Sequence, residues 1–136
     1  MPKTKVLLRT ESEEGTQRIA AQAEWTETEG GLSFFFEKEG AAFTVRPGIP
    51  ARIERMGGLR YVLELDPDRE TDAVIVSPYG ELSAKVRVRR AVFDKDAHRL
   101  QFFCEYALDF SGEVHAHTVA FTADLTFRTT KEGDVL

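Results

Sequence analysis

The chain has 136 residues, with 18 Lys and Arg against 23 Asp and Glu and a formal net charge of −5. This length predicts a single domain. A content of 42% hydrophobic and 30% charged residues is typical of a globular protein and excludes a disordered or membrane-spanning chain. The excess of acid disfavours a protein whose main task is to bind nucleic acid.

The first apolar run, residues 6–8, is too short for a signal peptide or a membrane span. Cys104 is the only cysteine, so neither an internal disulfide nor a zinc site built on several thiolates is available. A lone thiol suits a reducing compartment. We therefore expect a cytoplasmic protein that makes no contact with a membrane.

In chain order, short segments of alternating apolar and polar residues are separated by breaks that carry Gly or Asp. No segment keeps apolar residues at helical spacing over three turns, so we predict an all-β protein. The predicted strands are 4–11, 16–28, 32–38, 41–47, 51–56, 59–66, 72–77, 81–93, 98–110 and 113–128.

Neighbouring strands can pair only if their apolar faces stay on the same side of the sheet. A two-residue turn at 111–112 satisfies this condition, because it places Tyr106 opposite His117 and Phe102 opposite Phe121. Nearly all large apolar residues of both strands then share one face.

Two earlier turns also keep the faces consistent. A turn at 39–40 places Phe36 opposite Phe43, and a turn at 30–31 places Trp25 opposite Phe36. A turn at 57–58 leaves the faces in conflict, so the pairing of strands 51–56 and 59–66 stays open.

The strand 81–93 alternates between two faces. The apolar face carries Leu82, Ala84, Val86 and Val88. The opposite face carries the basic side chains Lys85, Arg87 and Arg89. The strand keeps its face into the next one if the connection around 94–96 has an odd number of residues.

One flat sheet of ten strands would leave a wide apolar face and two open edges, and closure removes both problems. We predict a small closed or nearly closed antiparallel meander barrel of about 8–10 strands, and a two-layer β-sandwich is the alternative. The barrel domain is 1–136, with an ordered core of roughly 4–128 and a C-terminal tail at 129–136. Whether side chains fill the interior stays open. The expected inward-facing residues are Ala21, Ala23, Ala84, Ala123, Phe34, Phe36, Phe43, Phe102 and Phe121.

Four segments in this order resemble the YwiB-like family of bacterial proteins: Arg55-Met56-Gly57, Ser77-Pro78-Tyr79-Gly80-Glu81-Leu82, Tyr106-Ala107-Leu108 and His115-Ala116-His117-Thr118-Val119. The resemblance spans roughly residues 5–127. It implies a calycin-like β-barrel, the architecture of lipocalins, and an unassigned function. The segment 63–68 departs from the family pattern, where a more aromatic and glycine-bearing stretch is expected.

Tyr106, His115 and His117 are the candidate ligand-binding residues. His115 and His117 are two apart on one strand, so they point to the same side about 6.6 Å apart. A metal needs a third ligand, and the nearest in-phase carboxylate, Glu113, is about 13 Å along the strand from His117. We expect no metal and no cofactor, and Cys104, on the core face, is not expected to be a catalytic nucleophile.

The leading hypothesis is a non-enzymatic barrel that binds a small apolar or amphipathic molecule beside Tyr106, His115 and His117. A plainer interpretation is that these side chains only pack and hydrogen-bond at one mouth of the barrel. A second hypothesis is an enzyme in which His117 is a general base and Tyr106 its partner. A third is a module that binds protein or RNA through the outer Lys/Arg stripe, which has few exposed rings to stack on bases. The sequence specifies neither the ligand nor the oligomeric state.

Overall fold

The computed structural model describes residues 3–126, which form ten antiparallel strands in one sheet. The predicted all-β class is confirmed. The strands are β1 (Lys3–Ser12), β2 (Gly15–Thr28), β3 (Gly31–Lys38), β4 (Ala41–Arg46), β5 (Ala51–Met56), β6 (Tyr61–Leu65), β7 (Thr71–Ser77), β8 (Gly80–Lys95), β9 (Arg99–Phe110) and β10 (Glu113–Asp124).

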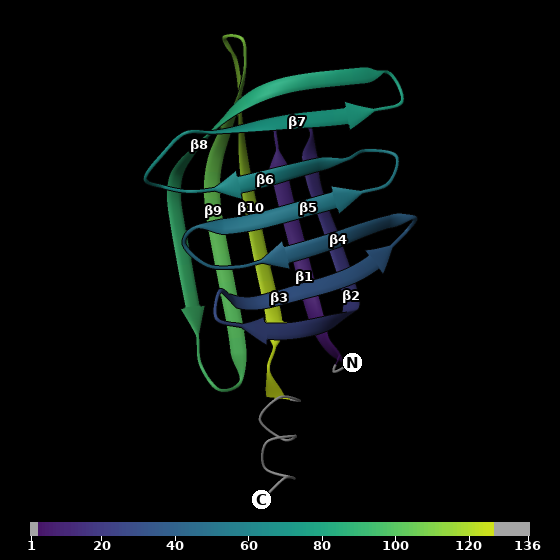
Figure 1. The fold of residues 1–136 in the computed structure, drawn as a ribbon, viewed down its shortest axis with the longest axis vertical. Helices are drawn as coiled ribbons and strands as arrows, with labels where there is room; N and C mark the ends of the chain where they lie inside the picture. The colour runs from purple at the N-terminus through teal and green to yellow at the C-terminus, as the bar shows by residue number, and fades with distance from the viewer. Residues whose placement is uncertain (1–2, 127–136) are drawn as a thin grey trace, which may run out of the picture.

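The sheet is a meander that closes on itself almost completely. The strand order is β6-β5-β4-β3-β2-β1-β10-β9-β8-β7, so β1 pairs with β10 and the two edges belong to β6 and β7. These edges are joined by one bridge, in which Arg60 and Val76 exchange two backbone hydrogen bonds of 2.9 Å. Figure 1 shows β3 to β7 running crosswise over β1, β2, β9 and β10. The predicted nearly closed barrel is confirmed, and the sandwich alternative is wrong because the ten strands form a single sheet.

The inward face carries the core, as the alternation predicts. Phe34 packs against Phe121 and Phe36 stacks on Phe43, with ring centroids 5.2 Å apart in both pairs. All the residues expected inside are buried except Ala21, which is half-buried against the core. Small side chains beside large rings let the narrow barrel close without crowding.

Two predicted hairpin registers are confirmed and one is wrong by two residues. Tyr106 lies opposite His117, and Phe36 lies opposite Phe43. Trp25, however, pairs with Phe34 rather than Phe36, because the turn is Glu29-Gly30 and Gly31 already belongs to β3. A slip of two residues keeps every side chain on its face, so the core prediction survives it.

The pairing left open between β5 and β6 has a longer connection than a two-residue turn. Ile53 pairs with Leu63 and Arg55 with Tyr61, so residues 57–60 join the strands. Both Ile53 and Leu63 are buried. The longer connection removes the conflict between the faces.

A β-bulge corrects the register between β8 and β9. The last pair of the hairpin is Lys95 and Leu100, so four residues, 96–99, lie between the paired positions. This even number would place the apolar faces of β8 and β9 on opposite sides of the sheet. The register shifts by one residue between Val88 and Arg90, which restores the match over the rest of β8.

The ends of two strands differ from the prediction. The last strand was expected to reach 128 but ends at Asp124, where the N–H of Leu125 donates to the carbonyl of His98 rather than to a neighbouring strand. Residues 127–128 and the expected tail at 129–136 lie outside the described residues. Leu82 was expected on the apolar face of its strand but is 61% exposed. It lies two residues from the β7–β8 turn and pairs only with Ile75.

Candidate functional site

A pocket of about 440 Å³ lies at the end of the barrel where the β1–β2 turn meets β6, β9 and β10. This volume lies within the range of about 300–1,000 Å³ that small-molecule sites occupy. Its apolar wall is formed by Leu59, Leu63, Ile75 and Leu108. The groups that can hydrogen-bond belong to Thr10, Glu11, Ser12, Glu14, Thr16, Gln17, Tyr61, Tyr106 and His117.

Tyr106 and His117 form the polar centre of the pocket. They are direct cross-strand partners, and their rings stack with centroids 5.4 Å apart and planes inclined by 14°. Burial raises the pKa of Tyr106, so the phenol stays neutral. Burial and the nearby His115 lower the pKa of His117, while Glu14 and Glu13 act in the opposite direction. A neutral imidazole therefore faces the pocket at neutral pH.

The polar atoms of this centre have no partner within the described chain. Tyr106 is only 6% exposed, yet no described residue forms a hydrogen bond with its hydroxyl, with the hydroxyl of Tyr61 or with the imidazole of His117. Within residues 3–126, no fully buried side-chain nitrogen or oxygen lacks a partner, so these atoms touch the open space of the pocket. A molecule in the pocket can therefore hydrogen-bond to them without displacing a protein partner.

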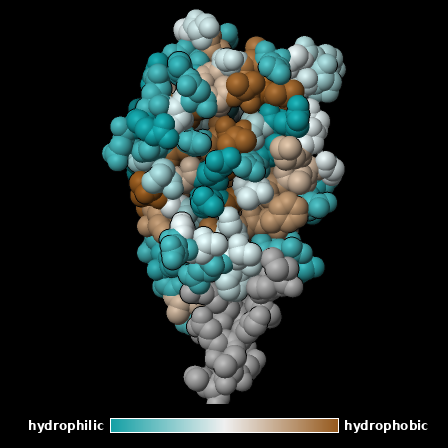
Figure 2. All heavy atoms as spheres, in the orientation of Figure 1, coloured by the Kyte–Doolittle hydropathy of each residue, from teal (hydrophilic) through white to brown (hydrophobic). Residues whose placement is uncertain are grey.

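Side chains on either side of the gap between β6 and β7 form part of the pocket's apolar wall. Leu63 on β6 and Ile75 on β7 both line the pocket, and these strands are bridged only at Arg60 and Val76. Burial raises the pKa of Tyr61, the first residue of β6, and Arg55 acts against this shift. Apolar side chains reach the surface over β6 and β7 (Figure 2). This wall is the part of the barrel with the fewest backbone hydrogen bonds holding it.

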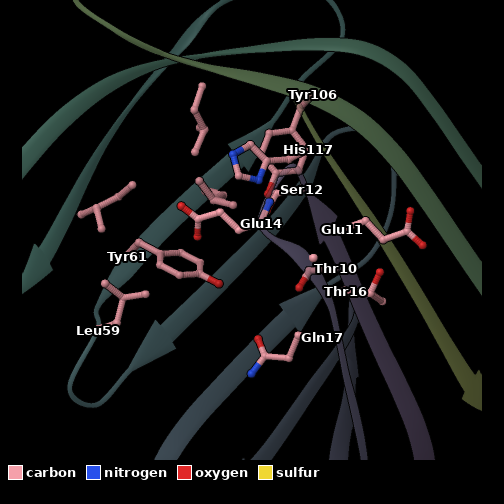
Figure 3. A pocket seen from close by; sticks show the side chains of 14 residues that line it. Thr10, Glu11, Ser12, Glu14, Thr16, Gln17, Leu59, Tyr61, Tyr106 and His117 are labelled. Atoms are coloured by element: carbon pink, nitrogen blue, oxygen red, sulfur yellow. The ribbon is translucent and has the colours of Figure 1, made fainter. Parts of the chain in front are cut away.

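Glu14, in the β1–β2 turn, supplies one of the two carboxylates that line the pocket. Its backbone N–H donates to Ser12 Oγ at 3.2 Å, which holds the turn in place. In Figure 3 the Glu14 side chain lies between the rings of Tyr61 and His117, whereas Glu11 points away from them. Glu11 also forms an ion pair with Arg9 at 3.5 Å.

The structure brings two of the three predicted site residues together and leaves the third aside. His115 is not among the residues that line the pocket. Its Nε2 lies 3.2 Å from the Glu113 carboxylate, and its ring meets the edge of Phe110 at 5.9 Å. His115 lies on the same face of β10 as His117, as expected, but at the rim of the barrel, outside the pocket lining.

Metal binding and nucleophilic catalysis by Cys104 have little structural support within the described residues. Within the described residues, no three His, Cys, Asp or Glu side chains lie close enough to hold a metal. Cys104 is fully buried, and burial with the nearby Glu105 raises the pKa of its thiol to about 12. Such a thiol is a poor nucleophile.

Carboxylates pair with two of the three residues of the outer basic stripe, and a further arginine, Arg90, lies beside it. Lys85 lies 2.5 Å from Asp72, and Arg87 contacts Glu70 at 2.6 Å and Asp109 at 3.0 Å. Arg90 lies 3.8 Å from Glu105 and over the ring of Phe103. Arg89, at the bulge, lines a neighbouring pocket of about 410 Å³.

Sequence reasoning missed the contributions of β1, the β1–β2 turn and β6, among them Thr10, Glu14 and Tyr61. These residues are far from Tyr106 in the sequence, and only closure of the barrel brings them to it. One signal was present: Thr10 continues the inward phase of Val6 and Leu8.

The fold and pocket define a nearly closed, ten-stranded antiparallel β-barrel with a pocket at one end. Residues 6–120 match the family described as Domain of unknown function (DUF1934), and the chain belongs to this family. The crystal structure of the YwiB protein from Bacillus subtilis is similar, with a TM-score of 0.72 at 15% identity over 90% of this chain and 92% of that one. This likeness shows the fold, and the YwiB-like resemblance is confirmed. No curated protein matches the chain. No helix within residues 3–126 is long and apolar enough to cross a membrane.

Proposed function

We propose that the protein binds a small, partly apolar molecule in the pocket beside Tyr106 and His117. The observation that carries this proposal is the Tyr106 hydroxyl, which belongs to a side chain only 6% exposed and has no hydrogen-bond partner in the described chain. Apolar walls with a few placed polar groups are the usual composition of a small-molecule site. The ligand would cover Leu63, Ile75 and Leu108 with its apolar part and hydrogen-bond Tyr106 and His117 with its polar part.

The proposed mode of binding is that of calycin-like barrels, which hold a ligand at the open end of the barrel. The proposal also keeps a cytoplasmic location, which is supported by the single free thiol of Cys104. His115 belongs to the proposed site only as a rim residue.

The two alternative functions have weaker support. Acid–base catalysis by His117 usually needs a group that orients the imidazole, and no described residue hydrogen-bonds it. A docking surface on the outer stripe would need free charge, and two of its three residues, Lys85 and Arg87, each lie beside a carboxylate. Neither alternative explains why polar atoms are left without partners inside an open pocket.

The test uses N-phenyl-1-naphthylamine, an uncharged probe whose fluorescence rises in apolar surroundings. We expect saturable binding to the wild type and weaker binding to Gln17→Trp, because Gln17 lines the pocket and an indole there fills it. Gln22→Trp is the matched control, since Gln22 is on the same strand, exposed and outside the pocket lining. Equal binding by both variants, or no binding by the wild type, would contradict the proposal.

A further inference from the structure

The charges around the pocket discriminate between possible polar ends of a ligand. None of its lining residues is Lys or Arg, whereas two are glutamates. Arg55, the cross-strand partner of Tyr61, already donates to the carbonyl of Leu59 at 2.6 Å and lies over the ring of Phe43. An anionic group in this pocket would meet two glutamates, because Arg89, the basic residue that shares Tyr106 and His117 with it, lines the neighbouring pocket instead.

Glu14 is the carboxylate without a counter-charge. Glu11 has Arg9, but within the described chain no ion pair or hydrogen bond occupies the Glu14 carboxylate. Glu14 lies beside two aromatic side chains, Tyr61 and Tyr106, and the neutral imidazole of His117 (Figure 3). Ring faces attract cations, and a phenol oxygen and a neutral imidazole nitrogen can accept hydrogen bonds from one.

The hydroxyl of Tyr106, which has no partner and touches the open space of the pocket, is a second observation, independent of the acidic turn. It belongs to a side chain more than nine-tenths buried, it has no partner in the described chain, and it lines the same pocket as Glu14. Carboxylate, hydroxyl and rings thus converge on one place, with the apolar wall of Leu63 and Ile75 beyond it.

We infer that the ligand of this pocket is an amphiphile with a protonated amine at its polar end, which Glu14 recognises, and a hydrocarbon part that covers Leu63, Ile75 and Leu108. This inference rests on the proposed function and specifies its ligand class. The ammonium group supplies hydrogen-bond donors, which the pocket's glutamates lack. The hydrocarbon part supplies apolar area that closes over the gap between β6 and β7.

The experiment compares three ligands that share one decyl chain: decylammonium, decanol and decanoate. Each ligand is tested for displacement of N-phenyl-1-naphthylamine at pH 8, below its solubility or micelle limit. At this pH decylamine is protonated and decanoate is ionised. We expect the amine to bind about 3-fold to 30-fold more tightly than the alcohol, the sum of an exposed ion pair and a cation–π contact. Decanoate should bind more weakly than both.

Two glutamate variants assign the preference to one carboxylate. Glu14→Gln should lower the ratio of amine affinity to alcohol affinity by about twofold or more, as loss of an exposed ion pair implies. Glu29→Gln removes the same charge from the turn at the other end of β2, outside the pocket, and should keep the ratio.

The outcomes separate this inference from the proposed function. An amine preference below about threefold, a preference for decanoate, no displacement by any decyl ligand, or a ratio that Glu14→Gln leaves intact overturns the inference while the pocket still binds the probe. Failure of the wild type to bind the probe at all overturns the proposed function itself.

Discussion

The imidazole of His117 lies flat against the phenol ring of Tyr106, with ring centroids 5.4 Å apart, and neither side chain hydrogen-bonds any described residue. Stacking fixes the orientation of both rings without using their polar atoms. The Tyr106 hydroxyl and the imidazole nitrogens therefore remain available to a molecule in the pocket.

Replacement of Tyr106 by Phe tests whether the hydroxyl serves the ligand or the fold. Because no protein partner is lost, Tyr106→Phe should change the free energy of unfolding by less than about 0.5 kcal/mol. Its affinity for a hydrogen-bonding ligand such as decanol should fall. Chemical denaturation and probe displacement measure the two effects. Tyr79→Phe, at a side chain 99% exposed, is the control. Destabilisation by more than about 1.5 kcal/mol would mean that the hydroxyl holds the fold together.

The pKa of His117 should lie below the ordinary value of 6.5, because burial and His115 disfavour the charged imidazole more than Glu13 and Glu14 favour it. The unfolded chain then binds more protons at this residue than the folded one. Its contribution to stability is fully present above pH 6.5 and is lost as the pH falls towards the folded pKa. NMR titration of the ring carbons measures the pKa directly. A midpoint at or above 6.5 would disagree with this burial.

The same linkage predicts a difference between variants. His117→Gln cannot take up a proton, so its melting temperature should fall less than that of the wild type between pH 7.5 and pH 5.5, roughly one unit either side of the free imidazole's pKa. Equal falls in the two proteins would show that His117 is not the group responsible.

Cys104 should react only when the barrel opens. Its side chain has no exposed surface, and burial with Glu105 raises its pKa to about 12, so little thiolate forms near neutral pH. Ellman's reagent at pH 8 should label the native protein at least about 100-fold more slowly than the protein in guanidinium, in proportion to the small open population. Rapid native labelling would place the thiol at the surface.

Gly57 should not tolerate a side chain, because it has a φ of +144°. A methyl group there would lie 3.1 Å from the carbonyl oxygen of Gly40 and 3.3 Å from the Cα of Ala41. We expect Gly57→Ala to cost about 1–3 kcal/mol of unfolding free energy. Gly58→Ala is the matched control, since no atom lies within 4 Å of a methyl group there. Equal stability of the two variants in urea would contradict this account of the β5–β6 connection.

The sequence predicts pairing where a turn is marked by local chemistry. At residues 111–112, Ser111 and Gly112 both adopt a positive φ, and the predicted register of β9 and β10 is correct. At Gly30-Gly31, either of two turns keeps the apolar faces aligned, so alternation could not choose between them. The bulge after Val88 is set by the pairing of β8 with β9, which no local pattern in β8 reveals.

For a similar reason, the sequence predicts only the part of the site that lies within one hairpin. Tyr106 and His117 belong to one hairpin, so a period of two and one turn suffice to place them together. Glu14 and Tyr61 reach the same pocket only because β1 pairs with β10 and β6 meets β7. No local sequence pattern near either residue predicts contacts that depend on closure of the whole sheet.

The central claim is that a ligand lies inside the barrel's open end, and intermolecular NOEs test it most directly. With methyl-labelled protein and bound N-phenyl-1-naphthylamine, the account predicts NOEs from the probe to Leu63, Ile75 and Leu108. NOEs confined to exposed methyl groups such as those of Leu82 and Val114 would contradict it.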